Sequence, residues 1–376
     1  MIKVVEIISD TNIGGAGILL MNRLSYTDRS IFDVSVILPR QSKLVKRLND
    51  LKIPFFEIDG CYDSSLDLSA IPKIFDILKR ITPHIINAHG CLSARIAALM
   101  AKVPTRIYTR HCVYPTSKIY RFPLVRGLNG IINCILSNKI IAVAHSARDN
   151  LVKMGIPASR ISVIINGAKA LERLSGSERI SFRKKLGIPK SATVVTICAR
   201  LEKCKDHITF LQAAKILALR SENYRFLIVG GGSLEKFLRA YAKKLKIERS
   251  VIFTGFVNDV TPFMNVTDIN VNCSVGTETS SLSISEGLSL GIPCVASDYG
   301  GNPYMVKNAA NGYIFAQKNP YELAEKIIRL ENSHIYKRVS ICAKKRFFCE
   351  LNANRMANDT DALYLSLVKK KRNGLI

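Results

Sequence analysis

Acidic residues are scarce in this 376-residue chain: it has 29 Asp and Glu against 55 Lys and Arg, a formal net charge of +26. Residues 77–148 contain no Asp or Glu at all, yet they contain eleven Lys or Arg. A second basic concentration, over residues 337–372, ends in three lysines and Arg372. This balance favours polyanionic partners: nucleic acid, an anionic membrane surface or phosphorylated substrates. A hydrophobic content of 48% with 22% charged residues describes a globular chain.

The sequence also has no apolar run of about 18 residues, the length that a membrane-spanning helix needs. The longest candidate, residues 127–144, is interrupted by three asparagines and Lys139. Residues 1–8 are strand-like with internal charges, unlike the basic region and apolar core of a signal peptide. We therefore expect a cytoplasmic protein that lies on the inner face of the membrane without spanning it.

The ten cysteines form no CxxC pair, and no His/Cys grouping has zinc-like spacing. Several lie in apolar runs, where cysteine acts as a small hydrophobe, so free thiols are expected. The only DxD motif, Asp359-Thr360-Asp361, falls in the predicted last helix and is expected to form a solvated face. The sequence therefore predicts catalysis without a metal or cofactor.

Short β-branched runs alternate with longer amphipathic stretches, which is typical of an α/β fold with parallel sheets covered on both faces. In the first half of the chain, strands are expected at residues 3–8, 33–38, 85–88, 106–110, 139–144 and 161–165, and helices at 15–26, 43–51, 68–81 and 92–101. In the second half, strands are expected at residues 193–199, 225–229, 251–254, 269–272, 294–296 and 313–315, and helices at 206–220, 233–245, 283–290 and 320–330.

A chain of this length is expected to form two domains. We predict a doubly wound, Rossmann-like domain over residues 1–168 and a second one over residues 169–352. The last segment, residues 353–376, is expected to be a helix that packs back on the first domain. Ligands of such sheets bind outside the carboxyl ends of the strands, which places the site in a central cleft that both domains face.

The most informative feature is a pair of glutamates, Glu278 and Glu286, with seven residues between them. Glycines and small polar residues surround both, and the buried-strand sequence of residues 292–296 follows. One carboxylate can accept hydrogen bonds from a hexose and the other from a ribose diol, while glycine amides approach closely. Taken alone, the pair also fits the acid–base couple of a hydrolase. With its glycines it favours a sugar-nucleotide site.

Two cations, Arg200 and Lys205, come directly after the first strand of the second domain. A forked guanidinium and a point ammonium at a strand end suit a diphosphate. Lys203 competes with Lys205 for this role, and an exposed basic turn is the alternative for the whole segment.

Glycine-rich turns follow three strands. Gly14 and Gly15 lie between the first strand and a helix, where backbone amides can approach an anion, although the spacing GxGxxG is absent. Gly231 and Val257 lie in two turns of the second domain that could read a nucleobase or could be plain turns.

His89 and His111 each end a strand of the first domain on its expected ligand side. A histidine there can bind a sugar hydroxyl or carry a proton near neutral pH, and a structural hydrogen-bonding role is the alternative. His89 and Tyr114 are the residues that we assign to the acceptor side.

In this order, the motifs resemble those of the retaining glycosyltransferases of family 4, known as group 1, which have the two-domain GT-B fold. The resemblance covers nearly the whole chain and is most specific from residue 200 to residue 315. It implies that Arg200 and Lys205 bind the donor diphosphate and stabilise its departure. It also implies that Glu286 holds the ribose hydroxyls. The other residues that the resemblance implies for the site are Glu278 and His111 beside the transferred sugar, Gly14 and Gly15 at the diphosphate, and Gly300, Gly301 and Asn302 around the sugar.

Three departures from the family pattern stand out. The family commonly has Lys-Gly where this chain has Lys205-Asp206, and a Gly-Phe-Gly is replaced by residues 279–281. Tyr304 occupies a position that is often Glu, so an acidic role there is in doubt. Residues 281–287 are similar to bacterial members that build capsular polysaccharide or exopolysaccharide.

We therefore predict a metal-independent, retaining transferase. It would move a hexose or N-acetylhexosamine from an NDP-sugar, with UDP favoured, to a lipid-linked or glycan acceptor in the synthesis of capsule, lipopolysaccharide or a similar polysaccharide. An isomerase of the UDP-N-acetylglucosamine 2-epimerase type has the same fold and needs no acceptor. A basic, non-catalytic nucleic-acid-binding protein is the third reading, although no segment resembles a nucleic-acid motif. An inactive glycosyltransferase homologue is the fourth.

Overall fold

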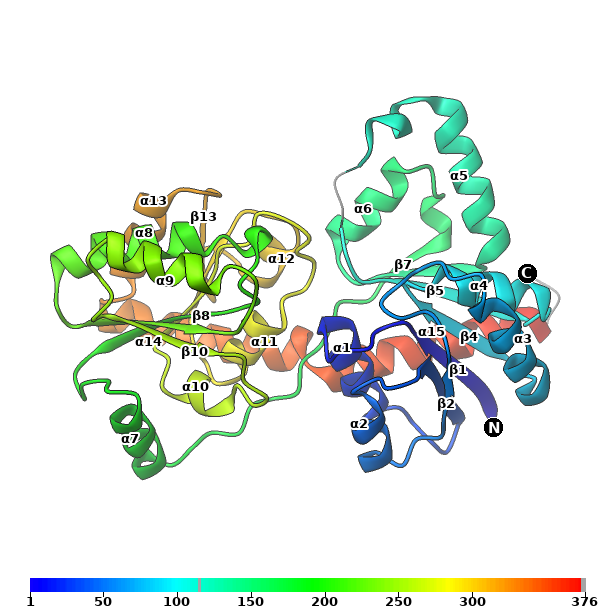
Figure 1. The fold of residues 1–376 in the computed structure, drawn as a ribbon, viewed down its shortest axis with the longest axis horizontal. Helices are drawn as coiled ribbons and strands as arrows, with labels where there is room; N and C mark the ends of the chain where they lie inside the picture. Colours follow the sequence, from blue (N-terminus) through cyan, green and yellow to red (C-terminus); the bar gives the residue numbers. More distant parts are fainter. Residues whose placement is uncertain (114–115, 373–376) are drawn as a thin grey trace. The chain divides into compact units, whose positions relative to one another are not determined.

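The computed structural model describes residues 1–113 and 116–372, and these form two compact units (Figure 1). The first unit comprises Met1–Gly167 together with the chain from Ala353 onward. The second comprises Ala168–Asn352. Each is described by itself below. Tyr114, which we assigned to the acceptor side, lies outside the described residues.

The first unit is built on a seven-stranded sheet with the order β3-β2-β1-β4-β5-β6-β7, in which every pairing is parallel. Such a sheet needs crossover connections, which the intervening helices supply. The strands are β1 (Ile2–Ile8), β2 (Phe32–Pro39), β3 (Phe55–Ile58), β4 (Ile85–His89), β5 (Thr105–Arg110), β6 (Lys139–Ala142) and β7 (Ile161–Val163). The helices are α1 (Gly15–Leu24), α2 (Val45–Asp50), α3 (Ala70–Ile81), α4 (Leu92–Met100), α5 (Pro123–Leu136), α6 (His145–Lys153) and α15 (Ala353–Arg372).

The two faces of this sheet differ in character. Alternate residues of a strand point to opposite faces, and Val5 and Ile7 of β1 join the apolar core beneath α3 and α4. Glu6, between them, points to the other face, which α1 and α15 cover. The last helix of the chain therefore completes the first unit.

The second unit has a six-stranded parallel sheet with the order β10-β9-β8-β11-β12-β13. Val195 and Ile197 of β8 pack beneath the helices α8, α9 and α13, whereas Val194 packs on the opposite face. The strands are β8 (Thr193–Cys198), β9 (Tyr224–Val229), β10 (Val251–Gly255), β11 (Ile269–Asn272), β12 (Cys294–Ser297) and β13 (Gly312–Phe315). The helices are α7 (Gly176–Lys185), α8 (His207–Arg220), α9 (Glu235–Lys244), α10 (Thr261–Asn265), α11 (Leu282–Ser289), α12 (Asn302–Met305), α13 (Pro320–Arg329) and α14 (Ser333–Arg346).

The expected α/β class with two doubly wound units is confirmed. The sequence pattern missed β3 and the helices α5, α6, α10, α12 and α14. The run at residues 127–144 divides into the end of α5 and the strand β6. Within the described residues, no helix is both long and apolar enough to cross a membrane.

The expectation for the DxD motif was wrong. Asp361 is buried and accepts a hydrogen bond from the backbone N–H of Asp28 at 3.2 Å, while Thr360 is buried beside it. Of the three residues, only Asp359 is exposed to solvent, and it forms an ion pair with Arg355 on the surface of α15. The periodicity of the helix did not reveal the burial because the partners come from the opposite end of the chain.

Candidate functional site

The segment after β8 carries the predicted cations. Arg200 and Lys203 are exposed, whereas Lys205 is partly buried. The ammonium of Lys205 lies 2.7 Å from a carboxylate oxygen of Glu278 and 3.4 Å from the hydroxyl of Ser274. The structure therefore distinguishes the two lysines of this turn, because Lys205 alone is directed at a second predicted site residue.

The Glu278 carboxylate is held by several donors at once. Besides Lys205, its Oε2 atom accepts hydrogen bonds from the Ser274 hydroxyl at 2.7 Å and from the Asn272 amide at 3.2 Å. Burial raises the pKa of Glu278, but attraction to Lys205 and these hydrogen bonds outweigh it, so that the pKa lies below its ordinary value. The residue is only 6% exposed, yet its carboxylate is ionised at neutral pH and fixed in place.

Glu286 has the opposite surroundings. It lies on α11, which begins after the N-cap residue Ser281. In the described part of the chain, no residue donates a hydrogen bond to its partly buried carboxylate. Burial, and then repulsion by Asp259, raise its pKa to about 7. An acceptor without an internal partner is available to the hydroxyl groups of a ligand.

Two glycines after β12 let this loop approach the Glu278 segment closely. Gly300 has φ +60°, and a Cβ there would lie 2.2 Å from the carbonyl oxygen of Glu278. A Cβ on Gly301 would lie 1.4 Å from the carbonyl oxygen of Thr279. Neither position tolerates a side chain without moving the Glu278 backbone.

Asn302 follows these glycines, but its side chain faces inward. It is fully buried and donates hydrogen bonds to Ser297 at 3.1 Å and to Asn272 at 3.3 Å. Its side-chain amide therefore braces the loop, and its backbone is the part that a ligand could approach.

The turn after β9 also packs closely against the cationic segment. A Cβ on Gly230 would lie 2.1 Å from the carbonyl oxygen of Ala199. The carbonyl of Gly231 accepts a hydrogen bond from the N–H of Leu201 at 3.0 Å. Val257 packs its side chain against a core cluster. Beside it, Phe256 is 73% exposed, which the sequence did not single out.

In the first unit, Gly14 is the N-cap of α1 and makes no side-chain capping bond. A Cβ on Gly15 would meet no atom within 4 Å, so its surroundings are open. The histidines lie together: His89 is buried, and its Nδ1 atom is 2.8 Å from Nε2 of the partly exposed His111. The two rings stack with their centroids 5.1 Å apart.

No three His, Cys, Asp or Glu side chains of the described residues gather as metal ligands would. Four charged residues of the predicted site lie in the second unit. Lys205 and Glu278 form an ion pair, Arg200 follows the strand β8, and Glu286 lies on α11. This set offers cations to a diphosphate and carboxylates to hydroxyl groups.

Two family models match this chain. "Glycosyltransferase Family 4" matches residues 13–169, all but the last two of which lie in the first unit, and "Glycosyl transferases group 1" matches residues 178–346 of the second. The chain belongs to the family 4, group 1 glycosyltransferases.

Curated relatives and solved structures resemble this glycosyltransferase over almost its full length. It is 24% identical to an Escherichia coli UDP-Gal:alpha-D-GlcNAc-diphosphoundecaprenol alpha-1,3-galactosyltransferase, with 90% of each chain covered. It is 22% identical to an N-acetyl-alpha-D-glucosaminyl L-malate synthase of Bacillus anthracis, with 97% of each chain covered. The structure of Anabaena Alr3699/HepE with UDP and glucose matches with a TM-score of 0.82 at 20% identity, covering 97% of this chain and 100% of that one. These similarities show the GT-B fold.

Two of the three departures of this glycosyltransferase from its family, Asp206 and Tyr304, have structural explanations. Asp206 has φ 48° and ψ 52°, a left-handed conformation that glycine adopts easily. The Asp206 carboxylate also caps α8, because it accepts hydrogen bonds from the backbone N–H of Thr209 and, at 2.6 Å, from the Thr209 hydroxyl. Tyr304 donates from its hydroxyl to Glu350 at 3.1 Å and stacks beneath the guanidinium of Arg346. It is therefore part of the packing between the loop and the end of α14.

Asn272 and Ser274 are the supporting residues that sequence reasoning missed. Both lie at the carboxyl end of β11, the edge where doubly wound sheets bind ligands. Polar residues at that position were the available signal. Their partner, Glu278, follows in the same loop between β11 and α11, and the irregular backbone of this loop gives no periodic signal from which the contacts could be predicted.

The raised pKa of Glu286 predicts a pH-dependent effect of Glu286→Gln. Between pH 4.5 and 7 the folded state holds a proton on Glu286 that the unfolded state has lost. The contribution of Glu286 to the free energy of unfolding is therefore most favourable at low pH and falls progressively up to pH 7. We expect the variant to match the wild type at pH 5 and to be more stable by about 1–2 kcal/mol at pH 8, after allowing for partial exposure.

Thermal unfolding at pH 5, 6.5 and 8 measures the difference. Glu278→Gln is the matched control, and its sign is opposite. The pKa of Glu278 is lowered, so its stabilisation is present at pH 8, and the control variant should be less stable than the wild type there. A difference between Glu286→Gln and the wild type that does not change with pH would contradict the assignment.

Proposed function

We propose that this glycosyltransferase moves a hexose or N-acetylhexosamine from a UDP-sugar to a lipid-linked or glycan acceptor in cell-surface polysaccharide synthesis. The observation that carries the proposal is the contrast between the two glutamates. Glu278 is an ionised, immobilised acceptor, whereas Glu286 is an acceptor without an internal donor. The first suits the hydroxyl groups of a sugar and the second suits the ribose diol.

The donor class is supported by the similar proteins. The Anabaena structure contains UDP and glucose, and the name of the E. coli relative specifies UDP-Gal and a diphosphoundecaprenol acceptor. In the present chain, Arg200 and Lys205 would contact the diphosphate. Exposed Phe256, beside the turn of Gly231, offers a flat apolar surface for a nucleobase.

Negative charge develops on the diphosphate as the sugar departs, and cations that are already in place stabilise it. We infer that Arg200 and Lys205 provide this stabilisation and that transfer proceeds without a metal and with retention of the anomeric configuration. Activity that persists in excess EDTA, and an NMR spectrum of the product with the anomeric configuration of the donor, are the expected results. Loss of activity in EDTA, or an inverted product, would contradict them.

Calorimetric titration with UDP-, GDP- and ADP-sugars tests the donor. We expect a UDP-sugar to bind and Glu286→Ala to weaken the binding by at least tenfold, because the ribose hydroxyls lose their acceptor. Binding of a UDP-sugar that the substitution leaves unchanged would overturn the site. Incubation with the donor alone separates transferase from isomerase, since an isomerase would release an altered UDP-sugar without any acceptor.

The first unit has a surface suited to an anionic bilayer, which we call the α5 surface. Apolar side chains follow one face of α5 at helical spacing, and Leu124 is 84% exposed. Lys118, Arg121 and Arg126 lie among them in the sequence and are exposed, and residues 77–148 contain no acidic residue. The exposed apolar residues of the α5 surface are Ile119, Phe122, Leu124, Leu128, Ile131, Ile132 and Ile135.

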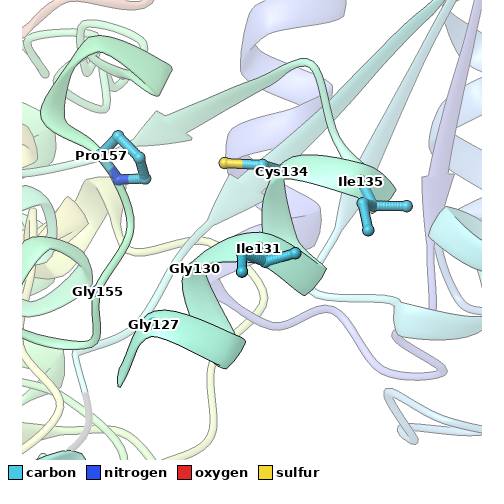
Figure 2. Close-up of a pocket in the computed structure, with 7 residues that line it drawn as sticks. All are labelled: Gly127, Gly130, Ile131, Cys134, Ile135, Gly155 and Pro157. Atoms are coloured by element: carbon cyan, nitrogen blue, oxygen red, sulfur yellow. The ribbon is translucent and has the colours of Figure 1, made fainter. Parts of the chain in front are cut away.

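An open apolar hollow of about 340 Å³ lies beside this surface (Figure 2). Ile131, Cys134 and Ile135 of α5 line it, together with Pro157 of the turn after α6. The close approach of Gly130 to that turn shapes it, since a Cβ there would lie 2.2 Å from the carbonyl oxygen of Gly155. We propose that the α5 surface rests on the inner face of the cytoplasmic membrane and that a lipid chain covers the hollow.

Charge reversal of Lys118, Arg121 and Arg126 to Glu tests the membrane contact. With vesicles that contain phosphatidylglycerol, we expect at least a tenfold loss of binding at low salt, since each basic residue near such a surface contributes about 1 kcal/mol. Co-sedimentation measures this, and binding of the wild type should fall as salt rises.

The matched control reverses three exposed lysines of α9, Lys236, Lys243 and Lys244, and so makes the same change in net charge. This control should bind vesicles nearly as well as the wild type. Equal losses in the two triple variants would show a response to net charge alone, and an unchanged α5 variant would rule out the contact.

A further inference from the structure

The helix α14 of the second unit (Figure 1) has a basic outer face. Residues 332–349 contain five Lys or Arg and no Asp or Glu. Arg346 is occupied within the fold, where its guanidinium forms an ion pair with Glu350 and donates to the carbonyl oxygen of Tyr304 at 2.7 Å. The other four basic residues are exposed, and together with two apolar residues they form what we call the α14 surface: Lys337, Arg338, Ile341, Lys344, Lys345 and Phe348.

The inner face of α14 fixes the helix to the second unit. Tyr336 donates from its hydroxyl to the carbonyl oxygen of Asp268 at 2.9 Å, and Ser340 donates to that of Gly291 at 2.5 Å. Because packing and hydrogen bonds hold this side of the helix, the opposite side cannot turn toward the core of the unit. Three residues of the inner face are fully buried: Val339, Ala343 and Phe347.

Two apolar side chains lie at the centre of the α14 surface. Ile341 is 62% exposed, and Phe348, in the π-helical turn Phe347–Leu351 that follows α14, is 53% exposed. Single exposed apolar residues are ordinary, but these two have cations on both sides. Side chains three or four positions apart lie on the same face of a helix. The four cations therefore flank Ile341 in two pairs, Lys337 with Lys344 and Arg338 with Lys345.

The cations of the α14 surface are not neutralised within the fold. Among the described residues, none of the four forms an ion pair. On α9 and α13, by contrast, Arg239 pairs with Glu235 and Arg329 pairs with Glu325. An apolar centre between unpaired cations is complementary to a surface that has anionic groups above an apolar layer. Nucleic acid would satisfy the cations but would leave Ile341 in contact with water.

We propose that the α14 surface binds an anionic lipid bilayer. The four cations lie among the headgroups, and Ile341 and Phe348 enter the boundary between the headgroups and the acyl chains. Two half-exposed side chains bury little apolar area, so the cations supply most of the affinity and the binding is sensitive to salt. The α14 surface belongs to the second unit and the α5 surface to the first. This is therefore a separate contact, and it does not depend on sugar transfer.

Tryptophan fluorescence tests whether the apolar centre enters the bilayer. The chain has no tryptophan, so Phe348→Trp introduces a single fluorophore. We expect its emission to shift to shorter wavelength with vesicles that contain phosphatidylglycerol, and to be quenched by lipids with brominated acyl chains, but not to change with pure phosphatidylcholine. Phe237→Trp on α9 is the matched control, because Phe237 is 50% exposed, and its emission should not change. An unchanged Phe348→Trp, or equal shifts in the two variants, would overturn the proposal.

Co-sedimentation with the same vesicles measures the contribution of the charges. Reversal of the four cations to Glu should lower binding at low salt at least tenfold, since each basic residue near an anionic surface contributes about fivefold to the affinity. Ile341→Ser combined with Phe348→Ser keeps every charge and should lower binding about tenfold. Equal losses in the quadruple variant and its control, or no loss in the serine variant, would contradict the bilayer contact. The control makes the same change in net charge at four exposed residues of the second unit: Lys236, Lys243, Lys244 and Lys246.

Other occupants of the α14 surface give different results. A shift in the emission of Phe348→Trp that grows with protein concentration, without vesicles, would assign the surface to a second copy of this chain and refute the bilayer. A shift with an RNA oligonucleotide, but none with vesicles, would refute it in favour of nucleic acid.

The independence of the two surfaces is tested by placing Phe348→Trp in the α5 triple variant. We expect the emission still to shift once the concentration of phosphatidylglycerol vesicles is raised. No shift at any lipid concentration would show that the α14 surface makes no contact of its own. None of these measurements uses a sugar donor, so they decide the proposal even if no sugar transfer is found.

Discussion

Replacing Lys205 by alanine is expected to lower kcat for sugar transfer by about 10²–10³-fold, the range measured when one preorganised donor to a developing anion is removed. Lys205 lies in the turn that follows β8, the end of the strand where doubly wound sheets bind ligands, and Glu278 holds its ammonium in place. In the proposed function, the substitution removes a cation from the departing diphosphate. It also leaves the buried Glu278 without its counter-charge.

The second effect predicts a loss of stability that accompanies the loss of rate. The pKa of Glu278 is held down by Lys205, so removal of the lysine should destabilise the fold by about 2–3 kcal/mol at neutral pH. Steady-state kinetics at saturating donor and urea unfolding measure the two effects. Lys205→Arg restores the charge and should recover stability better than rate, because the guanidinium fork differs in shape from an ammonium.

Lys203→Ala is the matched control, since Lys203 lies in the same short turn and differs in being exposed and unpaired with Glu278. We expect its kcat to stay within twofold of the wild type. A variant of Lys203 with the larger loss would reverse the assignment of the two lysines.

Glu6→Gln is expected to destabilise the first unit by about 3–5 kcal/mol, the cost of breaking a buried ion pair by removing one partner. The side chain of Glu6 is fully buried and that of Arg23 nearly so, so water cannot replace the lost carboxylate. Glutamine has nearly the same shape but no charge. The loss therefore measures the weaker compensation of the Arg23 guanidinium, which keeps Asp361 at 3.4 Å, more than a change of packing.

Hydrogen exchange followed by mass spectrometry is the suitable measurement, because it reports β1 and β4 separately from the second unit. The chain has no tryptophan to provide an intrinsic fluorescent probe. The control is Glu325→Gln, which removes the partner of Arg329 from an exposed pair on α13 and should cost less than about 0.5 kcal/mol. Faster exchange confined to α13 in Glu325→Gln, with none in β1 of Glu6→Gln, would contradict the prediction.

The periodicity of the sequence predicted most of the sheet strands to within one or two residues. Buried parallel strands are continuous β-branched runs, and this signal is local. β3 was missed because it is a short edge strand with a charged residue, Glu57, within it. α5 was missed because its second half and β6 form one largely apolar run, residues 127–144.

The candidate site was predicted in part. Glycines, cations and carboxylates at strand ends are visible in the sequence because the topology of a doubly wound sheet brings those ends to one edge. The sequence could not choose between Lys203 and Lys205, because both precede α8 in the same turn. Nor could it show that Asn302 braces the loop from inside.

By itself, the sequence determined the fold class, the family and the residue types of the candidate site, since all of these follow from local pattern and spacing. The tertiary structure alone decided which carboxylate has partners. Glu278 and Glu286 are alike in sequence, but contacts with Lys205 and Ser274 make the first an ionised anchor, while burial without a donor leaves the second with a raised pKa. It also decided that Asp361 and Tyr364, near the end of the chain, complete a cluster that begins at Glu6. Electrostatic environment depends on groups that meet only after folding, and no spacing in the chain encodes it.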